Sequence, residues 1–493
     1  MSQIHEFDTS YDVIVIGGGA SGLSCAVQAA KDGLTCALLE KEAQTGGSSA
    51  FAEGHAAFES DEQAKRGITV TKREAFDTYL DYSHWRANPS VVTRFVENAA
   101  TTVKKMRDEI GAVYDDVTVT ALDQPGELVT WHLVEGEIAK LIELLEAEAR
   151  RRDVDIFLGT AAREVLLDDA GKVVGLAVRD ADDQTVRLGA KAVVVASGGY
   201  ANNPEMIDQY TRFDKVGGKL INVGGPGNTG DGIKMVLAAG GAEHPSIGTL
   251  LLFPLMRDKT ITSHTNATGM QPYFWVNANG ERFINEAVGL NFGNAGDVVA
   301  ALPESMYWLI MDSATIRHLV EDGNEVGLGI YVCNHEKMVR LPDEITVDAA
   351  DPDRANVQSA QTIGELATKM GLDPEVVKAE VDAYNAACAA GEDARFHKPA
   401  KFLLALAEPP FYAIKMETGI MVSMGAILVD DHWRCLTKSG EPIKGLYAVG
   451  CDAGGLFGES YSLPIPGSAN GFALTSGWLT ADDIAERVRA GSL

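Results

Sequence analysis

A glycine-rich turn between an expected strand and an expected helix constrains the fold of this chain more than any other feature. The apolar, β-branched segment 11–16 predicts a buried strand, and the segment 20–31 predicts a helix. Between them lies Gly17-Gly18-Gly19-Ala20-Ser21-Gly22, which fits the spacing G-x-G-x-x-G. Glycines at this spacing between a strand and a helix are typical of a βαβ unit that binds a dinucleotide. The sequence therefore predicts a doubly wound parallel sheet with a dinucleotide site at its first turn.

The residues of this turn have separate physical roles. Gly17 permits the tight turn, Gly19 lets the backbone approach a diphosphate, and Gly22 lets the helix pack close to the strand. Ala20 and Ser21 lie at the helix start, where the partial positive charge of the helix N-terminus faces the phosphates. We expect these five residues to bind the cofactor.

An acidic residue at the end of the next expected strand narrows the choice of dinucleotide. Glu40 ends the apolar segment 35–40 and lies 18 residues after Gly22. A carboxylate in this place can accept hydrogen bonds from both ribose hydroxyls, and it would repel a 2′-phosphate. NADP is therefore disfavoured, whereas the turn and the acid together do not separate FAD from NAD.

Three later segments favour FAD, because together they can line an extended ligand that spans the sheet. The segment 45–49 has the small residues and hydroxyls that suit a pyrophosphate and a ribityl chain. The segment 192–199 is a buried strand that ends in Ser-Gly-Gly, and the segment 445–452 is a late strand followed by an acid. The residues expected to contact FAD in these segments are Gly47, Ser48, Ser49, Ser197, Gly198 and Asp452.

Length and charge limit the class of protein and its partners. The chain has 493 residues, which indicates more than one domain, and its formal net charge is -28. Such an acidic surface argues against nucleic acid and anionic membranes as partners. The six cysteines are scattered without a C-x-x-C pair, which indicates reduced thiols and no metal site. The N-terminal segment lacks the apolar core of a signal peptide, so we expect a cytoplasmic enzyme without stable membrane insertion.

The distribution of expected elements predicts two domains. Regular strands and helices occupy 1–246 and 406–493, whereas 247–405 alternates irregularly. We expect an α/β fold, with a Rossmann-like FAD-binding domain in the two outer pieces and an inserted α+β cap between them. Within the first piece, 154–158, 164–167 and 173–179 alternate like strands of a small sheet.

These segments resemble a known superfamily. Residues 11–49, 192–199, 227–232 and 445–474 are similar to the FAD enzymes that include fumarate reductases and 3-ketosteroid dehydrogenases, and Gly280-Glu-Arg-Phe-Ile-Asn-Glu286 resembles a motif of their cap. The resemblance implies bound FAD, a cap over the flavin, and hydride exchange with a C–C bond beside an activating group. The expected cofactor contacts then also include Lys41, Ala162, Asp231, Ser468 and Ala469, and we expect Asp231 to cap the helix that follows it.

Missing cations separate the two branches of this superfamily. The fumarate reductases carry Arg or His in the places that match 285–291, 421–425 and 461–471, where this chain has neither. Burying a dicarboxylate without them would be costly, so we do not expect fumarate reduction. The run 461–471 looks more like the ketosteroid dehydrogenases, which implies an apolar cyclic ketone such as a steroid as substrate.

The same run supplies candidates for catalysis. The Gly467 N–H and the Tyr461 hydroxyl can stabilise a developing enolate, and Tyr461 can carry the proton. The family tyrosine lies four residues before the glycine, a place occupied here by Leu463, whereas Tyr461 lies six before it. Tyr461 therefore also fits a packing role. Tyr273 fits either the substrate cavity or the core.

Two other functions stay open. One is reduction of an α,β-unsaturated acid or ester whose single carboxylate is held by Arg282 or another arginine, although Arg282 and Glu286 are expected to form a structural ion pair. The other is a flavin electron carrier. We expect electrons to come from, or go to, a quinone, a diffusing acceptor or a redox protein.

Overall fold

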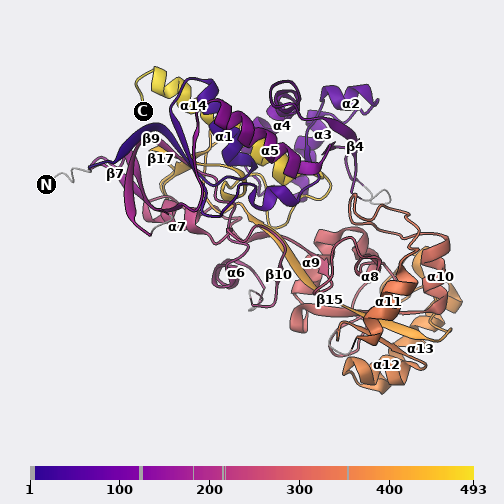
Figure 1. Ribbon diagram of the computed structural model, residues 1–493. Helices are drawn as coiled ribbons and strands as arrows, with labels where there is room; N and C mark the ends of the chain where they lie inside the picture. The colour runs from indigo at the N-terminus through magenta and orange to yellow at the C-terminus, as the bar shows by residue number, and fades with distance from the viewer. Residues whose placement is uncertain (1–5, 121–125, 181–182, 214–215, 217, 352–354) are drawn as a thin grey trace.

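An eight-stranded sheet forms the centre of the larger of two lobes (Figure 1). The computed structural model describes residues 6–120, 126–180, 183–213, 216, 218–351 and 355–493. Five strands pair in parallel in the order β17-β9-β1-β2-β6, and the β-branched half of β1 is fully buried, as is usual when both faces of a parallel sheet are covered. The predicted parallel sheet is confirmed. Its strands are β1 (Thr9–Ile16), β2 (Cys36–Leu39), β6 (Asp155–Phe157), β9 (Thr185–Val195) and β17 (Pro442–Ala448).

The three segments expected to form a small sheet all belong to this main sheet. The segment 154–158 contains β6, which pairs with β2 at one edge. The other two contain β7 (Ala161–Leu167) and β8 (Val173–Arg179), which pair with each other and join the sheet because β8 also pairs with β9. The expectation of a small sheet is wrong, because β9 is 11 residues long and has room to pair with β1, β8 and β17. The antiparallel β16 (Arg434–Leu436) closes the opposite edge.

Two helices that begin at the cofactor region pack closely against each other. They are α1 (Ala20–Lys31), which follows the glycine turn, and α14 (Ser468–Arg489), which ends the fold. Gly477 permits the close approach, because a Cβ there would meet the backbone of Ser21. The other helices of this lobe are α2 (Asp61–Lys65), α3 (Lys72–Tyr82), α4 (Pro89–Lys105), α5 (Glu137–Arg151), α6 (Pro204–Tyr210) and α7 (Asp231–Ala238), with short turns η1 (Gly47–Phe51), η2 (Met106–Ile110) and η6 (Gly450–Asp452).

A three-stranded antiparallel sheet lies beside α14 in the larger lobe. It consists of β3 (Gly54–Ala56), β5 (Trp131–Val134) and β4 (Tyr114–Thr118), in that order. The start of α14 is fixed on it, because the Ala56 N–H donates to the Gly467 carbonyl at 2.9 Å. A Cβ on Gly467 would lie 2.6 Å from the Ala56 nitrogen, so only glycine fits there. This contact sets where the first turn of α14 points.

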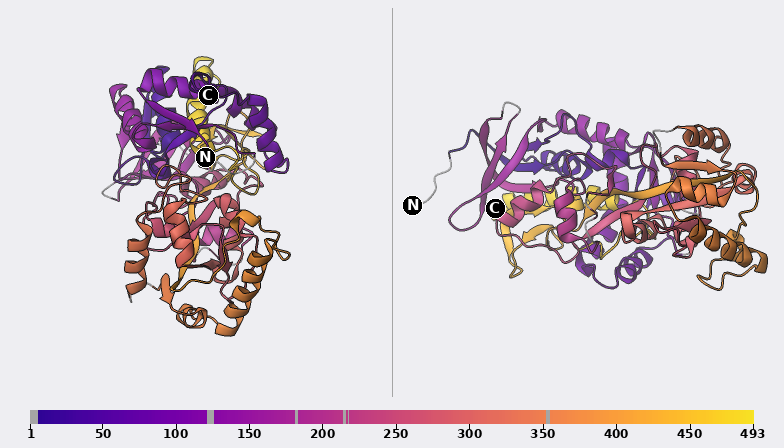
Figure 2. Two further views of the ribbon diagram at one scale, coloured as in Figure 1. Left: turned by 90° about the vertical axis from the view of Figure 1, so that its right-hand side faces the viewer. Right: turned by 90° about the horizontal axis from the view of Figure 1, so that it is seen from below.

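The smaller lobe is built around a six-stranded, mostly antiparallel sheet. Its longest strand is β15 (Phe411–Met424), which lies after the predicted boundary at 405 and pairs with β10, β11, β13 and β14. Figures 1 and 2 show β15 running from this lobe into the larger one. The other strands are β10 (Ile221–Asn222), β11 (Thr249–Leu255), β12 (Phe274–Val276), β13 (Met306–Asp312) and β14 (Val357–Ala360). The helices are α8 (His264–Gly269), α9 (Phe292–Ala300), α10 (Ser313–Glu321), α11 (Leu341–Ala350), α12 (Ile363–Met370) and α13 (Pro374–Ala390), with short turns η3 (Glu286–Leu290), η4 (Pro303–Ser305) and η5 (Ala400–Phe402).

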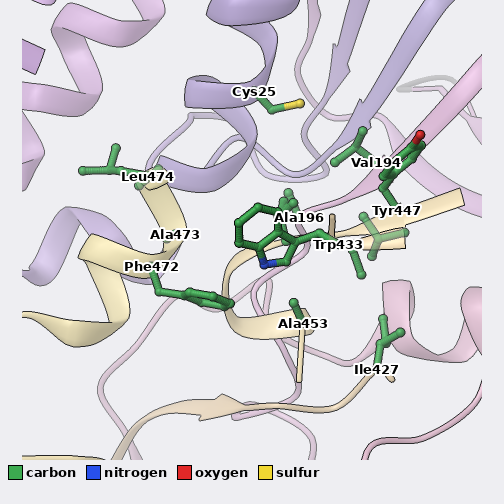
Figure 3. Close-up of a cluster of buried hydrophobic side chains, with 14 of the residues drawn as sticks. Cys25, Val194, Ala196, Ile427, Trp433, Tyr447, Ala453, Phe472, Ala473 and Leu474 are labelled. Carbon is green, nitrogen blue, oxygen red and sulfur yellow. The ribbon is translucent and has the colours of Figure 1, made fainter. Parts of the chain in front are cut away.

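A buried aromatic cluster holds the sheet and α14 in register. Figure 3 shows the fully buried Trp433 at its centre, with Phe472 of α14 on one side and Val194 and Tyr447 of the sheet on the other. The ring centroids of Trp433 and Phe472 lie 6.1 Å apart. Val194, Tyr447 and Phe472 come from β9, β17 and α14, and Trp433 precedes β16, so their packing fixes the helix start relative to the carboxyl ends of the strands.

Candidate active site

A cavity of about 350 Å³ lies at the carboxyl ends of β1, β2 and β9, where α/β sheets usually bind ligands. The glycine turn, the end of β2 and the segment 45–49 all line it, as expected for an extended ligand. The predicted cofactor residues that line this cavity are Gly17, Gly19, Ala20, Ser21, Glu40, Lys41, Gly47, Ser48, Ser49, Ala162, Ser197, Gly198 and Asp231.

The glycine turn has the shape that a diphosphate needs. A Cβ on Gly19 would have only the Gly46 carbonyl oxygen at 3.8 Å and the Ser49 Oγ at 3.9 Å nearby, so its missing side chain leaves open space. Gly19 is the N-cap of α1 and has no side chain to cap the helix, and the one side-chain acceptor at that helix start among the described residues is Ser49 Oγ, 3.4 Å from the Ala20 nitrogen. Amides at a helix start that no side chain satisfies attract an anion. These features fit FAD, whose diphosphate would occupy that space.

Polar side chains line the cavity beyond the turn. The Glu40 carboxylate accepts hydrogen bonds from the Gly18 and Glu42 amides, both at 2.8 Å, which fixes its orientation. Lys41 Nζ lies 2.7 Å from the Asp231 carboxylate. The expectation that Asp231 caps α7 is wrong, because Gly230 is the N-cap and the Asp231 carboxylate pairs with Lys41.

Four predicted cofactor residues do not line this cavity. Gly22 is buried, and a Cβ there would meet the Gly17 carbonyl oxygen. Asp452 is fully buried and accepts hydrogen bonds at 3.1 Å from the Gly198 and Gly199 amides, so its carboxylate fixes the turn after β9. Ser468 is fully buried against Tyr79 and the Ile465 carbonyl, and Ala469 lines a second cavity.

The second cavity has a volume of about 210 Å³ and adjoins the first. The two share Ser48, Ser49, Phe51, Cys451 and Ala473 as lining residues, so they form neighbouring parts of one space. Most of the wall is apolar. Among the described lining residues there is no Lys, Arg or His, and Glu53 is the one acid. The apolar and aromatic lining residues include Phe51, Trp131, Leu251, Phe253, Ile261, Phe292, Leu328, Tyr331, Met421, Val422, Tyr461 and Leu463.

Tyr461 and Gly467 both line this second cavity, so the structure brings these two predicted residues together. The Tyr461 hydroxyl oxygen accepts a hydrogen bond from the Ala469 N–H, in the first turn of α14, at 3.4 Å. Burial raises the pKa of Tyr461 to about 12. The ring stacks on Phe457 at a centroid distance of 5.3 Å, so packing and access to the cavity are combined in one side chain.

Tyr273 and Arg282 lie in the core of the smaller lobe and line neither cavity. Tyr273 is buried in the lobe's apolar cluster, edge-on to His318. Arg282 donates to Glu286 and to Asp393, each at 2.7 Å, so the predicted structural ion pair is confirmed. A guanidinium engaged in this way, outside the cavity wall, does not hold a substrate carboxylate.

Glu53 is the residue that sequence reasoning missed. It precedes β3 and is 7% exposed, and its Oε2 accepts a hydrogen bond from the Ile330 amide at 3.1 Å. Burial, opposed by the Ile330 hydrogen bond and aided by the charge of Glu137, raises the pKa of Glu53 to about 7. The sequence did contain a signal: Glu53 is a lone acid in the small and apolar run 50–57 that follows the predicted FAD segment.

Comparison with known proteins identifies the family. Residues 12–464 match the family described as FAD binding domain. A vinyl phenol reductase of Lactiplantibacillus plantarum is 34% identical, with 95% of each chain covered. A 3-oxosteroid 1-dehydrogenase of Mycolicibacterium smegmatis is 27% identical, with 97% of this chain and 98% of that protein covered. Among solved structures, the open conformation of a flavocytochrome c3 fumarate reductase has a TM-score of 0.76 at 24% identity, covering 97% of this chain and 79% of the other.

The match covers most of the chain, and its glycine turn, sheet and two-lobed architecture are those of the expected superfamily. The predicted fold, cofactor and enzyme class are confirmed. The chain belongs to the FAD binding domain family, and it is an FAD-dependent oxidoreductase that acts on CH–CH groups.

Proposed function

We propose that this enzyme reduces a C=C bond conjugated to an aromatic ring or a carbonyl in a small, uncharged substrate. The observation that carries the proposal is the second cavity, which adjoins the FAD cavity and has an apolar wall. Apolar walls with few polar groups bind apolar ligands and use the polar groups to orient them. The 34% identical relative named vinyl phenol reductase supports reduction of an alkene on an aromatic ring.

The size of the cavity favours a single ring over a steroid. About 210 Å³ is below the range of roughly 300–1,000 Å³ that is usual for drug-sized ligands. Four fused rings would need the cap to move outward, whereas one substituted ring fits the space as it is. The expectation of a cyclic apolar substrate is therefore kept and narrowed to a smaller molecule.

Charge argues against fumarate and other carboxylates. The described part of the cavity wall contains no cation, and its one ionisable carboxyl, Glu53, would repel an anion. Transfer of a carboxylate from water to such a wall is unfavourable unless a partner charge is present. Reduction of an unsaturated acid through Arg282 has no support from the geometry, because Arg282 is paired with Glu286 and Asp393.

The chain's own residues supply binding and the proton. FAD, held by the start of α1, Glu40 and the segment 47–49, supplies hydride exchange when bound. Tyr461 gives a proton to the carbon that does not receive hydride, since this tyrosine lines the cavity. The Ala469 amide and the N-terminus of α14 stabilise the oxyanion that Tyr461 then carries. The Gly467 amide, at the same helix start, is proposed to orient a substrate carbonyl.

Electrons come from an external carrier in this proposal. The expected donor is a quinone or a redox protein. The segment 225–230 also fits G-x-G-x-x-G, but it lines the FAD cavity itself and so does not indicate a second nucleotide site. No helix within the described residues has both the length and the apolar character needed to cross a bilayer. A cytoplasmic location remains the expectation from the sequence.

The test is reoxidation of the chemically reduced, FAD-loaded enzyme under anaerobic conditions. We expect 4-vinylphenol and the small enone 4-phenylbut-3-en-2-one to restore the flavin absorbance rapidly. Fumarate should not restore it, and a 3-ketosteroid should act slowly. Failure of every uncharged conjugated alkene, or fastest reoxidation by fumarate, would overturn the proposal.

A further inference from the structure

Glu53 is the one ionisable carboxyl among the described residues that line the second cavity. It lies between η1, which borders both cavities, and β3, and it faces the loop 327–331 of the smaller lobe. Ser48, Ser49 and Phe51 line both cavities, so they lie on the side of the second cavity that adjoins the FAD cavity. The loop 327–331 lines the second cavity only. Glu53 therefore lies in the part of the wall formed jointly by both lobes.

The backbone of the cap loop holds the Glu53 carboxyl in place. The Ile330 amide donates to Oε2 at 3.1 Å. Gly329 packs against the same carboxyl, and a Cβ at this position would collide with it. Among the described residues this amide is the one hydrogen-bond donor to the group, and no cation pairs with it. A carboxyl has about four acceptor positions, so the remaining ones are open to a ligand in the cavity.

An under-satisfied carboxyl in an apolar wall favours a ligand with a hydrogen-bond donor. Leaving such a group without partners costs free energy, and an O–H donor compensates that cost more fully than a C–H surface does. The titratable groups that face Glu53 among the described residues are Glu137 and Tyr331, whose hydroxyl donates to Glu137 at 2.7 Å. Neither compensates the charge of Glu53.

We propose that Glu53 accepts the hydroxyl proton of a phenolic substrate, so that the substrates of this site are uncharged hydroxyaryl alkenes. This inference rests on the proposed alkene reduction. It adds a catalytic role for one side chain and a requirement for a free hydroxyl group on the ring. The printed name of the 34% identical relative, vinyl phenol reductase, agrees with that substrate class.

The chemistry explains why the hydroxyl proton must move. An alkene on an electron-rich ring is a poor hydride acceptor. When its terminal carbon gains a proton from Tyr461, forming a C–H bond and breaking the C=C π bond, the positive charge spreads onto the phenolic oxygen. The O–H bond of the phenol then breaks, and its proton passes to the Glu53 carboxylate. The product of this step is a neutral quinone methide. The benzylic carbon accepts hydride, the ring regains aromaticity, and the phenolate oxygen takes the proton back from Glu53. The sum is one proton and one hydride added across the C=C bond.

The first experiment compares substrates in the reduced, FAD-loaded enzyme. Wild type should be reoxidised by 4-vinylphenol but not by 4-methoxystyrene, which has no hydroxyl proton. In Glu53→Gln, the ratio of the 4-vinylphenol rate to the 4-phenylbut-3-en-2-one rate should fall about 100-fold, as is usual for loss of a proton-transfer group. Glu135→Gln, an exposed acid outside the cavity, is the matched control and should keep the wild-type ratio.

The second experiment measures binding to the oxidised enzyme and needs no turnover. 4-Ethylphenol should bind wild type about tenfold more weakly at pH 5.5 than at pH 8.5, because a protonated Glu53 is a poorer acceptor. A hydroxyl-free analogue, 4-ethylanisole, should show no such dependence.

The outcomes separate the two proposals. If wild type is reoxidised by neither the vinyl phenol nor the enone, the proposed function fails. If it is reoxidised by both but 4-methoxystyrene is equally good, or Glu53→Gln keeps the wild-type ratio, the function stands and the role of Glu53 is wrong. If Glu53→Gln does not retain FAD, the pH dependence of 4-ethylphenol binding to wild type decides, and a flat profile would reject the role.

Discussion

The Lys41 ammonium lies 2.7 Å from the Asp231 carboxylate, and this contact joins two residues that are 190 positions apart. Lys41 follows β2 and Asp231 begins α7, and both line the FAD cavity. The pair therefore fixes the distance between two segments that border the ligand, and Thr229 Oγ1 accepts a further hydrogen bond from Lys41.

Replacing Lys41 with Met should weaken FAD binding. The change leaves Asp231 unpaired at the cavity wall, and we expect an FAD affinity about tenfold lower, which is close to 1.4 kcal/mol. Fluorescence titration of apoprotein with FAD measures it. Asp231→Asn added to Lys41→Met should cause little further loss, because the two residues act through one contact. If the two changes lowered the FAD affinity additively, the contact between Lys41 and Asp231 would not be what supports FAD binding.

Replacing Gly19 with Val should remove FAD binding and keep the fold. The Val side chain would occupy the open space over the turn that the diphosphate needs. We expect purified Gly19→Val to be colourless, with the far-ultraviolet circular dichroism of wild type. Gly364→Ala, in α12 of the smaller lobe with space around it, is the control and should stay yellow. A yellow Gly19→Val protein would contradict the assigned diphosphate position.

Replacing Tyr461 with Phe should slow catalysis without releasing FAD. The variant keeps the ring that stacks on Phe457 and loses the hydroxyl that the Ala469 amide contacts. Reoxidation of the reduced enzyme by an enone should slow about 100-fold. Tyr210→Phe, whose hydroxyl donates to Glu243 outside both cavities, should be unaffected. An unchanged rate in Tyr461→Phe would assign this tyrosine to packing alone.

Replacing Arg282 with Leu should destabilise the smaller lobe. The change removes the guanidinium from the buried Glu286 and Asp393, and leaves Lys398 as the one cation that pairs with Glu286 among the described residues. Breaking a buried pair from one side costs about 3–5 kcal/mol. Urea unfolding followed by tryptophan fluorescence would measure this cost. Arg317→Leu removes an exposed pair with Glu408 and should cost much less, because solvent screens that pair. Equal effects of the two changes would argue against the buried pair as a stabilising contact.

The stability of the protein should fall as pH rises, through Glu53. The pKa of Glu53 is raised from 4.5 to about 7 in the folded protein, so the folded state binds its proton more tightly than the unfolded state does. The contribution of Glu53 to the free energy of unfolding is about 3 kcal/mol. It is fully present below about pH 4.5 and is lost as the pH rises to about 7. Glu53→Gln should therefore match wild type at pH 4.5 and melt at a higher temperature at pH 8. A difference in melting temperature that does not change with pH would contradict the raised pKa.

Local rules made much of the fold predictable from the sequence. The segment 363–370 has helical periodicity, and α12 occupies those residues. The glycine turn lies between β1 and α1 as predicted, because its backbone conformation depends on residues next to one another. The place of β7 and β8 in the main sheet could not be predicted from the sequence, because alternation of apolar residues indicates a strand but not its pairing partner.

The sequence by itself determined the class of fold, the cofactor and the family. The glycine turn and Glu40 indicate a dinucleotide site through local backbone shape and charge, and the later segments 45–49, 192–199 and 445–452 favour FAD. Tertiary structure alone decided that Tyr273 is buried, that Asp231 pairs with Lys41, and that Glu53 faces a cavity. The Glu53 site needs an amide 277 residues away, at Ile330, and only the packing of one lobe against the other brings that amide within hydrogen-bonding distance.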